Sequence, residues 1–227
     1  MKIKVYYYDF KYWRAEAIRC GLFLQNIPFD DIRDREKLLE IKPKSPFRAF
    51  PIVDIDGTIL SQSQAILSYI GKLGSIFDYD AAGLNKADAA YPRMYPADGD
   101  YMGMFKCDEI INGATDVSVT VGTTMGLPKD QVEAKRTALI QKDGGRLYMH
   151  CSGLDSILCS GAPGVACGTT LTVADLCIWM LVRWLSKGIL DYIPTDFVSS
   201  NFPNLQAVYD ACEKNESIAE YVKQYHK

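Results

Sequence analysis

Residues 50–70 read FPIVDIDGTILSQSQAILSYI, and their pattern is the clearest fold signal in the chain. Strand-forming residues stand on both sides of Asp56-Gly57, and an Asp-Gly pair between such runs favours a tight β-hairpin. The serines after the second run can cap a helix, and the apolar residues that follow recur at helical spacing. The stretch therefore predicts two paired strands followed by a helix.

The residues upstream of this hairpin predict two strand-helix pairs. Apolar residues alternate over residues 3–7, as in a strand, and residues 13–23 change to helical spacing. A short strand at 29–32 and a charged helix at 35–42 follow. The first 73 residues therefore predict the order βαβαββα.

The rest of the chain predicts helices only. Glycines and prolines between 71 and 96 mark a linker, and TVAD at 172–175 is a capping box directly before the most apolar run. We expect an α/β plus all-α protein with three parts. These are an N-terminal domain at 1–74, a linker or insertion at 75–93 and a helical bundle domain at 94–227.

Composition and charge argue against several function classes. The 227 residues carry a net charge of −3, so no strong basic field exists to hold nucleic acid or an anionic membrane. No apolar run reaches the roughly 20 residues that a membrane span needs, and the N-terminus shows no signal peptide. We therefore expect a cytoplasmic protein with neither a nucleic acid nor a membrane as partner.

The cysteines and histidines do not form a metal or redox motif. The seven cysteines are scattered without a C-x-x-C pair, and only two histidines are present. Neither a disulfide framework nor a zinc site has the right spacing. We expect reduced, mostly buried thiols and no bound metal.

Three segments together resemble the cytosolic glutathione S-transferases. In that family a proline precedes a β-hairpin that ends in Gln-Ser at a helix start, as in residues 50–70. KVYYYDF at 4–10 and RAEAIR at 14–19 resemble the family's Tyr-Phe-Asp strand end followed by Arg-Ala-Glu, and LTVADL at 171–176 resembles its core-helix capping box. The resemblance covers essentially the whole chain and is closest to the tyrosine-type, sigma-like enzymes.

The resemblance implies a thioredoxin-like first domain, a helical domain that forms the electrophile site, and a homodimer. It implies glutathione as co-substrate, no prosthetic group, and detoxification by transfer of the glutathione thiolate to hydrophobic electrophilic small molecules. Two alternatives stay open: a sigma-type glutathione-dependent isomerase or peroxidase, and a non-catalytic ligandin or crystallin-like protein. A thioredoxin-like oxidoreductase is disfavoured, because no cysteine stands at the first strand-to-helix junction.

The resemblance also implies a set of glutathione-binding residues. Ser63, at a helix N-terminus, would bind the γ-glutamyl carboxylate beside Gln62. Pro51 corresponds to a cis-proline that turns the backbone of Phe50 toward the cysteinyl peptide. The other matched positions are Lys42 for the glycine carboxylate, Arg14 at the start of the first helix, and Asp116, which would reach the glutathione amine of a partner subunit. A solvated or structural role is the alternative at each charged position.

The catalytic hydroxyl falls on Tyr7 or Tyr8. Counting back from Arg14 without a gap gives Tyr8, whereas aligning Tyr-Phe-Asp with Tyr7-Tyr8-Asp9 gives Tyr7 and a loop one residue longer. Strand alternation favours Tyr7, which shares a face with Ile3 and Val5. A tyrosine hydroxyl that donates to sulfur stabilises the thiolate, which is the nucleophile.

The electrophile pocket is less defined. Trp13 stands where the family has a small residue, and Tyr12 precedes it. Together with Tyr101 and Phe105 they could give the pocket an aromatic wall. Aromatic residues at helical spacing are also common in cores. The segment at 74–93 looks like an insertion that could cap the site or alter a dimer edge.

Overall fold

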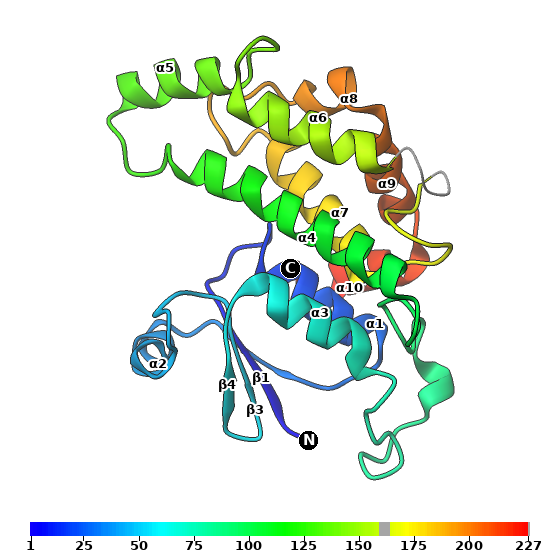
Figure 1. Ribbon diagram of the computed structural model, residues 1–227. Helices are drawn as coiled ribbons and strands as arrows, with labels where there is room; N and C mark the ends of the chain where they lie inside the picture. Colours follow the sequence, from blue (N-terminus) through cyan, green and yellow to red (C-terminus); the bar gives the residue numbers. More distant parts are fainter. Residues whose placement is uncertain (159–163, 227) are drawn as a thin grey trace. The chain divides into compact units, whose positions relative to one another are not determined.

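The computed structural model describes residues 1–158 and 164–226, which form two compact units (Figure 1). Unit 1 comprises Met1–Tyr95 and Lys214–Lys227, and unit 2 comprises Pro96–Glu213. We expected the last helix to belong to the helical domain at 94–227. In the structure this helix, Glu216–Tyr225, belongs to unit 1 and packs against the first helix, Ala15–Leu24. An amphipathic pattern shows that a helix buries one face, but it does not identify the surface that receives it.

Unit 1 contains a four-stranded mixed sheet in the order β2-β1-β3-β4. Strands β1 and β2 are parallel, and the pairs β1/β3 and β3/β4 are antiparallel. The strands are β1 (Ile3–Tyr6), β2 (Asp30–Ile32), β3 (Ile52–Ile55) and β4 (Thr58–Leu60). The helices are α1 (Ala15–Leu24), α2 (Arg35–Ile41), α3 (Ser63–Leu73) and α10 (Glu216–Tyr225), with short 3₁₀ turns η1 (Lys42–Lys44) and η2 (Lys86–Asp88). The predicted order βαβαββα and the hairpin at Asp56-Gly57 are confirmed.

The register of the sheet assigns its side chains to two faces. Tyr6 lies opposite Ile52, and both pack with Leu38 and Ile41 of α2 on one face. Val5, one residue earlier, points to the other face, since side chains alternate along a strand. Helices α1 and α3 pack against each other and cover that second face (Figure 1). Both faces are covered, which explains why the central strands are almost fully buried.

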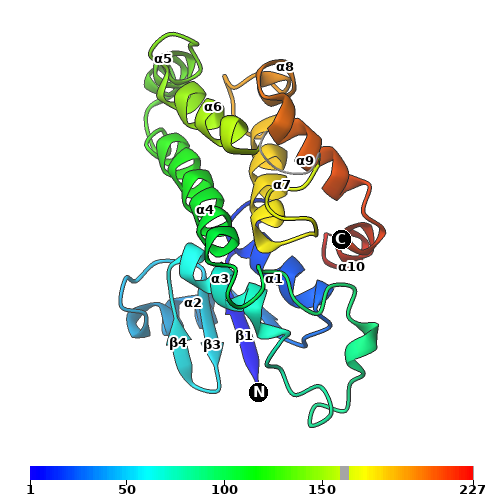
Figure 2. The same ribbon diagram turned by 45° about the vertical axis from the view of Figure 1, so that its right-hand side comes forward.

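Unit 2 is all-helical, as predicted. Its most buried helix, α7, packs against α4, α8 and α9 (Figure 2). The helices are α4 (Tyr101–Gly122), α5 (Lys129–Leu139), α6 (Arg146–Leu158), α7 (Val173–Ser186), α8 (Phe197–Asn201) and α9 (Pro203–Glu213). The fold class, a thioredoxin-like β/α domain followed by a helical domain, is thus confirmed.

The predicted capping box at the start of α7 is present. The Asp175 carboxylate accepts hydrogen bonds from the Thr172 backbone N–H at 2.8 Å, the Thr172 hydroxyl at 2.7 Å and the Ala166 N–H at 2.6 Å. Burial raises the pKa of Asp175 to about 6, although these hydrogen bonds oppose the shift. The box fixes the N-terminus of the central helix where water cannot satisfy its N–H groups.

Six cysteines of the described ranges are buried thiols: Cys20, Cys107, Cys151, Cys167, Cys177 and Cys212. Cys159 lies outside the described residues. Within residues 1–158 and 164–226, every helix is too short or too polar to cross a membrane.

Candidate functional site

Five of the predicted site residues line one small cavity of unit 1, with a volume of about 30 Å³. Three segments meet there: the start of α1, the loop before β3 and the start of α3. The lining residues are Arg14, Phe47, Ala49, Phe50, Pro51, Gln62 and Ser63. The fold therefore brings together residues that lie up to 49 positions apart in the sequence.

Ser63 is the first residue of α3, as predicted, and its side chain is buried. The first N–H groups of a helix have no partner within the helix, and the helix dipole adds partial positive charge at this end. A hydroxyl, free N–H groups and a positive dipole at one wall of a cavity favour a carboxylate.

Gln62, directly before α3, has a φ of +70°. This left-handed region is unfavourable for residues other than glycine, and such strain persists only where the surrounding structure holds it. Arg14, on the opposite segment of the cavity, has a φ of +53°. Strained residues of this kind cluster at binding sites, so the two outliers point to this cavity as a functional site.

The peptide bond between Phe50 and Pro51 is cis, as the resemblance implied. The next residue, Ile52, begins β3, so the backbone of Phe50 stands at the end of the sheet. The Phe50 ring meets the Tyr8 ring edge-on, with centroids 5.2 Å apart. Tyr8 therefore adjoins the cavity through Phe50 without lining it.

Tyr7 and Tyr8 have different environments. Tyr7 is 8 % exposed and Tyr8 is 53 % exposed. The guanidinium of Arg19 lies 5.9 Å from the centre of the Tyr7 ring, which places Tyr7 on the α1 side of the sheet. Burial raises the pKa of Tyr7, and the charges of Arg14 and Arg19 oppose this shift. Tyr7 therefore stays a neutral hydroxyl, able to donate, at physiological pH.

Arg19 is a site residue that the sequence analysis missed. Its guanidinium is fully buried, donates to Glu16 Oε2 at 2.8 Å and Asp31 Oδ1 at 2.9 Å, and reaches the Tyr8 carbonyl oxygen at 3.5 Å. It thus holds the backbone of one candidate tyrosine while it lies over the ring of the other. The available signal was a Glu and an Arg three residues apart within an otherwise apolar helix.

Phe47 and Ala49 were also missed, although both line the cavity. They belong to the proline-rich loop before β3, which has no periodic pattern from which side-chain directions could be inferred. Only their proximity to Pro51 could have indicated a role.

Other predicted residues lie outside this cavity. Lys42 begins η1 and is half-buried, and Asp116 is an exposed residue of α4 in unit 2. Tyr12 is half-buried, with its ring 5.5 Å from that of Phe10, whereas Trp13 is only 5 % exposed.

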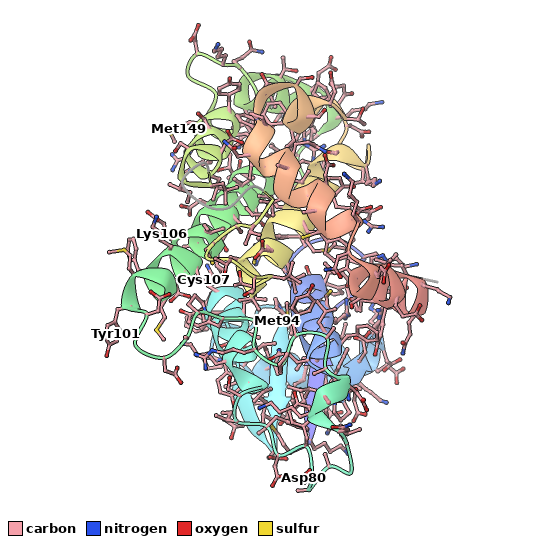
Figure 3. The ribbon with its side chains drawn as sticks, turned by 90° about the vertical axis from the view of Figure 1, so that its right-hand side faces the viewer. Asp80, Met94, Tyr101, Lys106, Cys107 and Met149 are labelled. Carbon is pink, nitrogen blue, oxygen red and sulfur yellow. The ribbon has the colours of Figure 1, made fainter. Side chains whose placement is uncertain are left out.

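The two aromatic residues expected from the helical domain lie on α4 and belong to unit 2. Tyr101 is 80 % exposed and points outward at the start of the helix (Figure 3), and Phe105, one turn later, is 59 % exposed. Both are therefore surface residues of α4 and do not contribute to the core of unit 2.

Comparison with known proteins agrees with this fold. Residues 116–225 match a family described as glutathione S-transferase, C-terminal domain. A glutathione S-transferase from Anopheles gambiae is 27 % identical over 224 residues, which cover 96 % of this chain and 94 % of that protein. The chain thus combines a thioredoxin-like domain with a helical transferase-type domain. Residues 116–225 are thus similar to a glutathione S-transferase C-terminal domain, and the chain over almost its whole length is similar to a glutathione S-transferase.

Solved structures with the same fold span almost the full chain. The prostaglandin synthase D of Nilaparvata lugens aligns with a TM-score of 0.73 and 18 % identity, covering 99 % of this chain and 98 % of that one. The glutathione S-transferase of Ascaris lumbricoides aligns with a TM-score of 0.68 and 20 % identity over 100 % and 98 % of the two chains. At these identities the structural likeness supports the fold alone.

Proposed function

We propose that this protein is a glutathione transferase that binds the γ-glutamyl carboxylate of glutathione at the small cavity of unit 1, with the rest of the tripeptide on the surface beside it, and uses the glutathione thiolate as a nucleophile. The observation that carries this proposal is the convergence of Arg14, Gln62 and Ser63 with the Phe50–Pro51 segment around one cavity. A tripeptide with carboxylates at its ends needs an anion site, an extended backbone partner and a place for its thiol. The three segments around the cavity would supply the anion site and the backbone partner. The end of β1 would supply the place for the thiol.

The γ-glutamyl end of glutathione would lie at the N-terminus of α3. Ser63 offers its hydroxyl and the N–H groups of the first turn, and Gln62 adds an amide beside them. Arg14 contributes positive charge from the facing segment of the same cavity. The cysteinyl backbone would pair with that of Phe50, as a strand added to a sheet end, and Lys42 would meet the glycine carboxylate.

The thiol would then lie near the end of β1. We assign the activating hydroxyl to Tyr7, because it is a buried donor close to Arg14 and Arg19. Lowering the thiol pKa from about 8.5 by two units requires about 2.7 kcal/mol of preferential interaction with the anion. A charge-assisted hydrogen bond in a partly dry site, together with nearby positive charge, is of that order.

The second substrate in this proposal is a hydrophobic electrophile. Among the aromatic candidates, Tyr101 and Phe105 are accessible on the surface of α4 and could contact it. The protein would act as a homodimer in which Asp116 of one subunit serves the glutathione amine of the other. The proposal includes a cytoplasmic location.

The experiment that tests the proposal is an ultraviolet titration of glutathione bound to the wild-type protein, Tyr7→Phe and Tyr8→Phe. We expect the bound thiol to ionise well below its free pKa in the wild type and in Tyr8→Phe, but not in Tyr7→Phe. Loss of the shift in Tyr8→Phe alone would transfer the role to Tyr8. Glutathione that fails to bind, or binds with an unshifted thiol, would favour the ligandin-like alternative, whereas an isomerase or peroxidase would differ only in its second substrate.

A further inference from the structure

A second, larger cavity lies within unit 1, at a distance from the residues assigned to glutathione. It is formed by the end of α1, the 84–90 stretch of the inserted segment and α10, which lie on the same side of the unit in Figure 2. Its volume is about 490 Å³, within the range of small-molecule sites. It shares no lining residue with the first cavity.

Aromatic rings form the apolar part of this cavity. The rings of Phe29 and Tyr225 stack with centroids 5.7 Å apart and an interplanar angle of 14°. The Phe23 ring meets Tyr225 edge-on at 6.0 Å. All three residues are half-buried, so part of each aromatic side chain is accessible to a ligand, although the Tyr225 ring is also stacked on that of Tyr221 at 5.0 Å. Aromatic surfaces bind apolar groups and also attract cations.

The charged groups around the cavity are acidic. Asp88 and Glu220 line it, and its described lining residues include no lysine, arginine or histidine. Glu220 is paired with Lys223 at 3.4 Å, but both side chains are more than half exposed, so solvent screens this pair strongly. The amides of Asn26 and Gln224 add hydrogen-bonding groups without charge.

We infer that this cavity is a second binding site, specific for a small organic cation with an apolar body, such as an arylammonium ion. Accessible aromatic rings and two carboxylates attract an ammonium group, and the volume accommodates its apolar part. An anion of the same size meets two carboxylates, of which, among the described residues, only Glu220 has a lysine partner, at an exposed and strongly screened position. The site does not depend on the glutathione cavity, so this inference stands or falls separately from the proposed transferase activity.

The test uses benzyltrimethylammonium as the cation and benzenesulfonate as an anion of similar size. Dissociation constants are measured by NMR titration of the full-length protein without glutathione. Ala90 is an exposed residue that lines the cavity. The variant Ala90→Trp is designed to fill the cavity with an indole ring. The double variant Asp88→Asn/Glu220→Gln removes the charge but preserves the shape.

The matched control is the double variant Asp80→Asn/Glu36→Gln, which makes the same change in net charge at exposed positions outside the cavity. Asp80 lies far out on the inserted segment (Figure 3). Circular dichroism and thermal denaturation are measured in parallel to show that each variant is folded.

We expect the wild type to bind the cation and to bind the anion at least about tenfold more weakly. Ala90→Trp should abolish binding of the cation, and Asp88→Asn/Glu220→Gln should weaken it about fivefold, with no change in the control. The inference is overturned if the wild type does not bind the cation at millimolar concentration, or if the anion binds equally well. It is also overturned if a folded Ala90→Trp binds normally, or if the control loses as much affinity as the cavity variant.

Discussion

The hydroxyl of Tyr221 donates a hydrogen bond of 2.7 Å to Glu16 Oε1, across 205 positions of the sequence. Both side chains are fully buried, and the bond joins α10 to α1 within unit 1. The same carboxylate interacts with His226 Nε2 at 2.7 Å and accepts a hydrogen bond from Arg19 through its other oxygen at 2.8 Å. Because Arg19 also holds the Tyr8 backbone, one connected network joins the end of the chain to the candidate catalytic tyrosines.

Replacing Tyr221 with phenylalanine should destabilise the protein. The change leaves a buried, charged carboxylate without one of its donors, which costs about 1–3 kcal/mol of unfolding free energy. Urea denaturation followed by circular dichroism measures this loss. Tyr225→Phe is the matched control, because Tyr225 is on the same helix but only half-buried. Equal stabilities of the two variants would show that the hydrogen bond to Glu16 contributes nothing.

Acid should weaken unit 1 through Glu16. Burial by itself raises the pKa of Glu16, but the hydrogen bond with His226 and the charge and hydrogen bond of Arg19 outweigh it, so that the net pKa lies below the ordinary 4.5. A carboxyl group whose pKa is lower in the folded than in the unfolded state stabilises the protein at pH values above the unfolded-state pKa. This stabilisation is lost as the pH falls through the folded-state pKa.

The unfolding free energy should therefore decrease as pH is lowered below about 4.5. This decrease should be shallower in Glu16→Gln than in Glu36→Gln, which alters an exposed glutamate. A pH series of urea denaturations from neutral pH to pH 3 measures both slopes. Identical slopes in the two variants would exclude Glu16 as a source of the acid sensitivity.

Asp175 should contribute a pH dependence of the opposite sign. Its pKa of about 6 in the folded protein exceeds the ordinary 3.8, so the folded state binds the proton more tightly and this contribution to stability falls as pH rises from about 4 to 6. Asp175→Asn removes this titration and places an amide NH₂ group among donors from Thr172 and Ala166. We expect a loss of about 2–4 kcal/mol at neutral pH.

The control for this variant is Asp130→Asn, at an exposed position in the first turn of α5. Denaturation at pH 5 and pH 7 measures both effects. A loss of stability no greater than that of the control would mean that the capping box does not hold the start of α7.

Gln62 offers a test that separates binding from stability. Gln62→Gly and Gln62→Ala both remove the side-chain amide, but only glycine relieves the strain of a φ of +70°. We expect the glycine variant to be more stable than the alanine variant by about 1 kcal/mol, and both to bind glutathione more weakly. Thermal denaturation and calorimetric titration with glutathione measure the two quantities. Wild-type affinity in either variant would remove Gln62 from the binding site.

The sequence by itself determined the local elements and the fold class. Asp56-Gly57 between strand-forming runs and the TVAD box before an apolar run depend on interactions within a few residues, which a linear pattern records directly. The alternation from Ile3 to Tyr7 likewise assigned Tyr7 to the same face of the strand as Ile3 and Val5. These features follow from local geometry and need no knowledge of distant neighbours.

Only the tertiary structure decided which distant residues meet. It brought Phe47 and Ala49 to the cavity of Ser63, and it joined Tyr221 to Glu16. It also placed the inserted segment beside α10 to form the second cavity. The physical reason is that an amphipathic helix or an irregular loop shows in its sequence what it must bury, but its partner is set by the packing of the whole unit, which no local pattern contains.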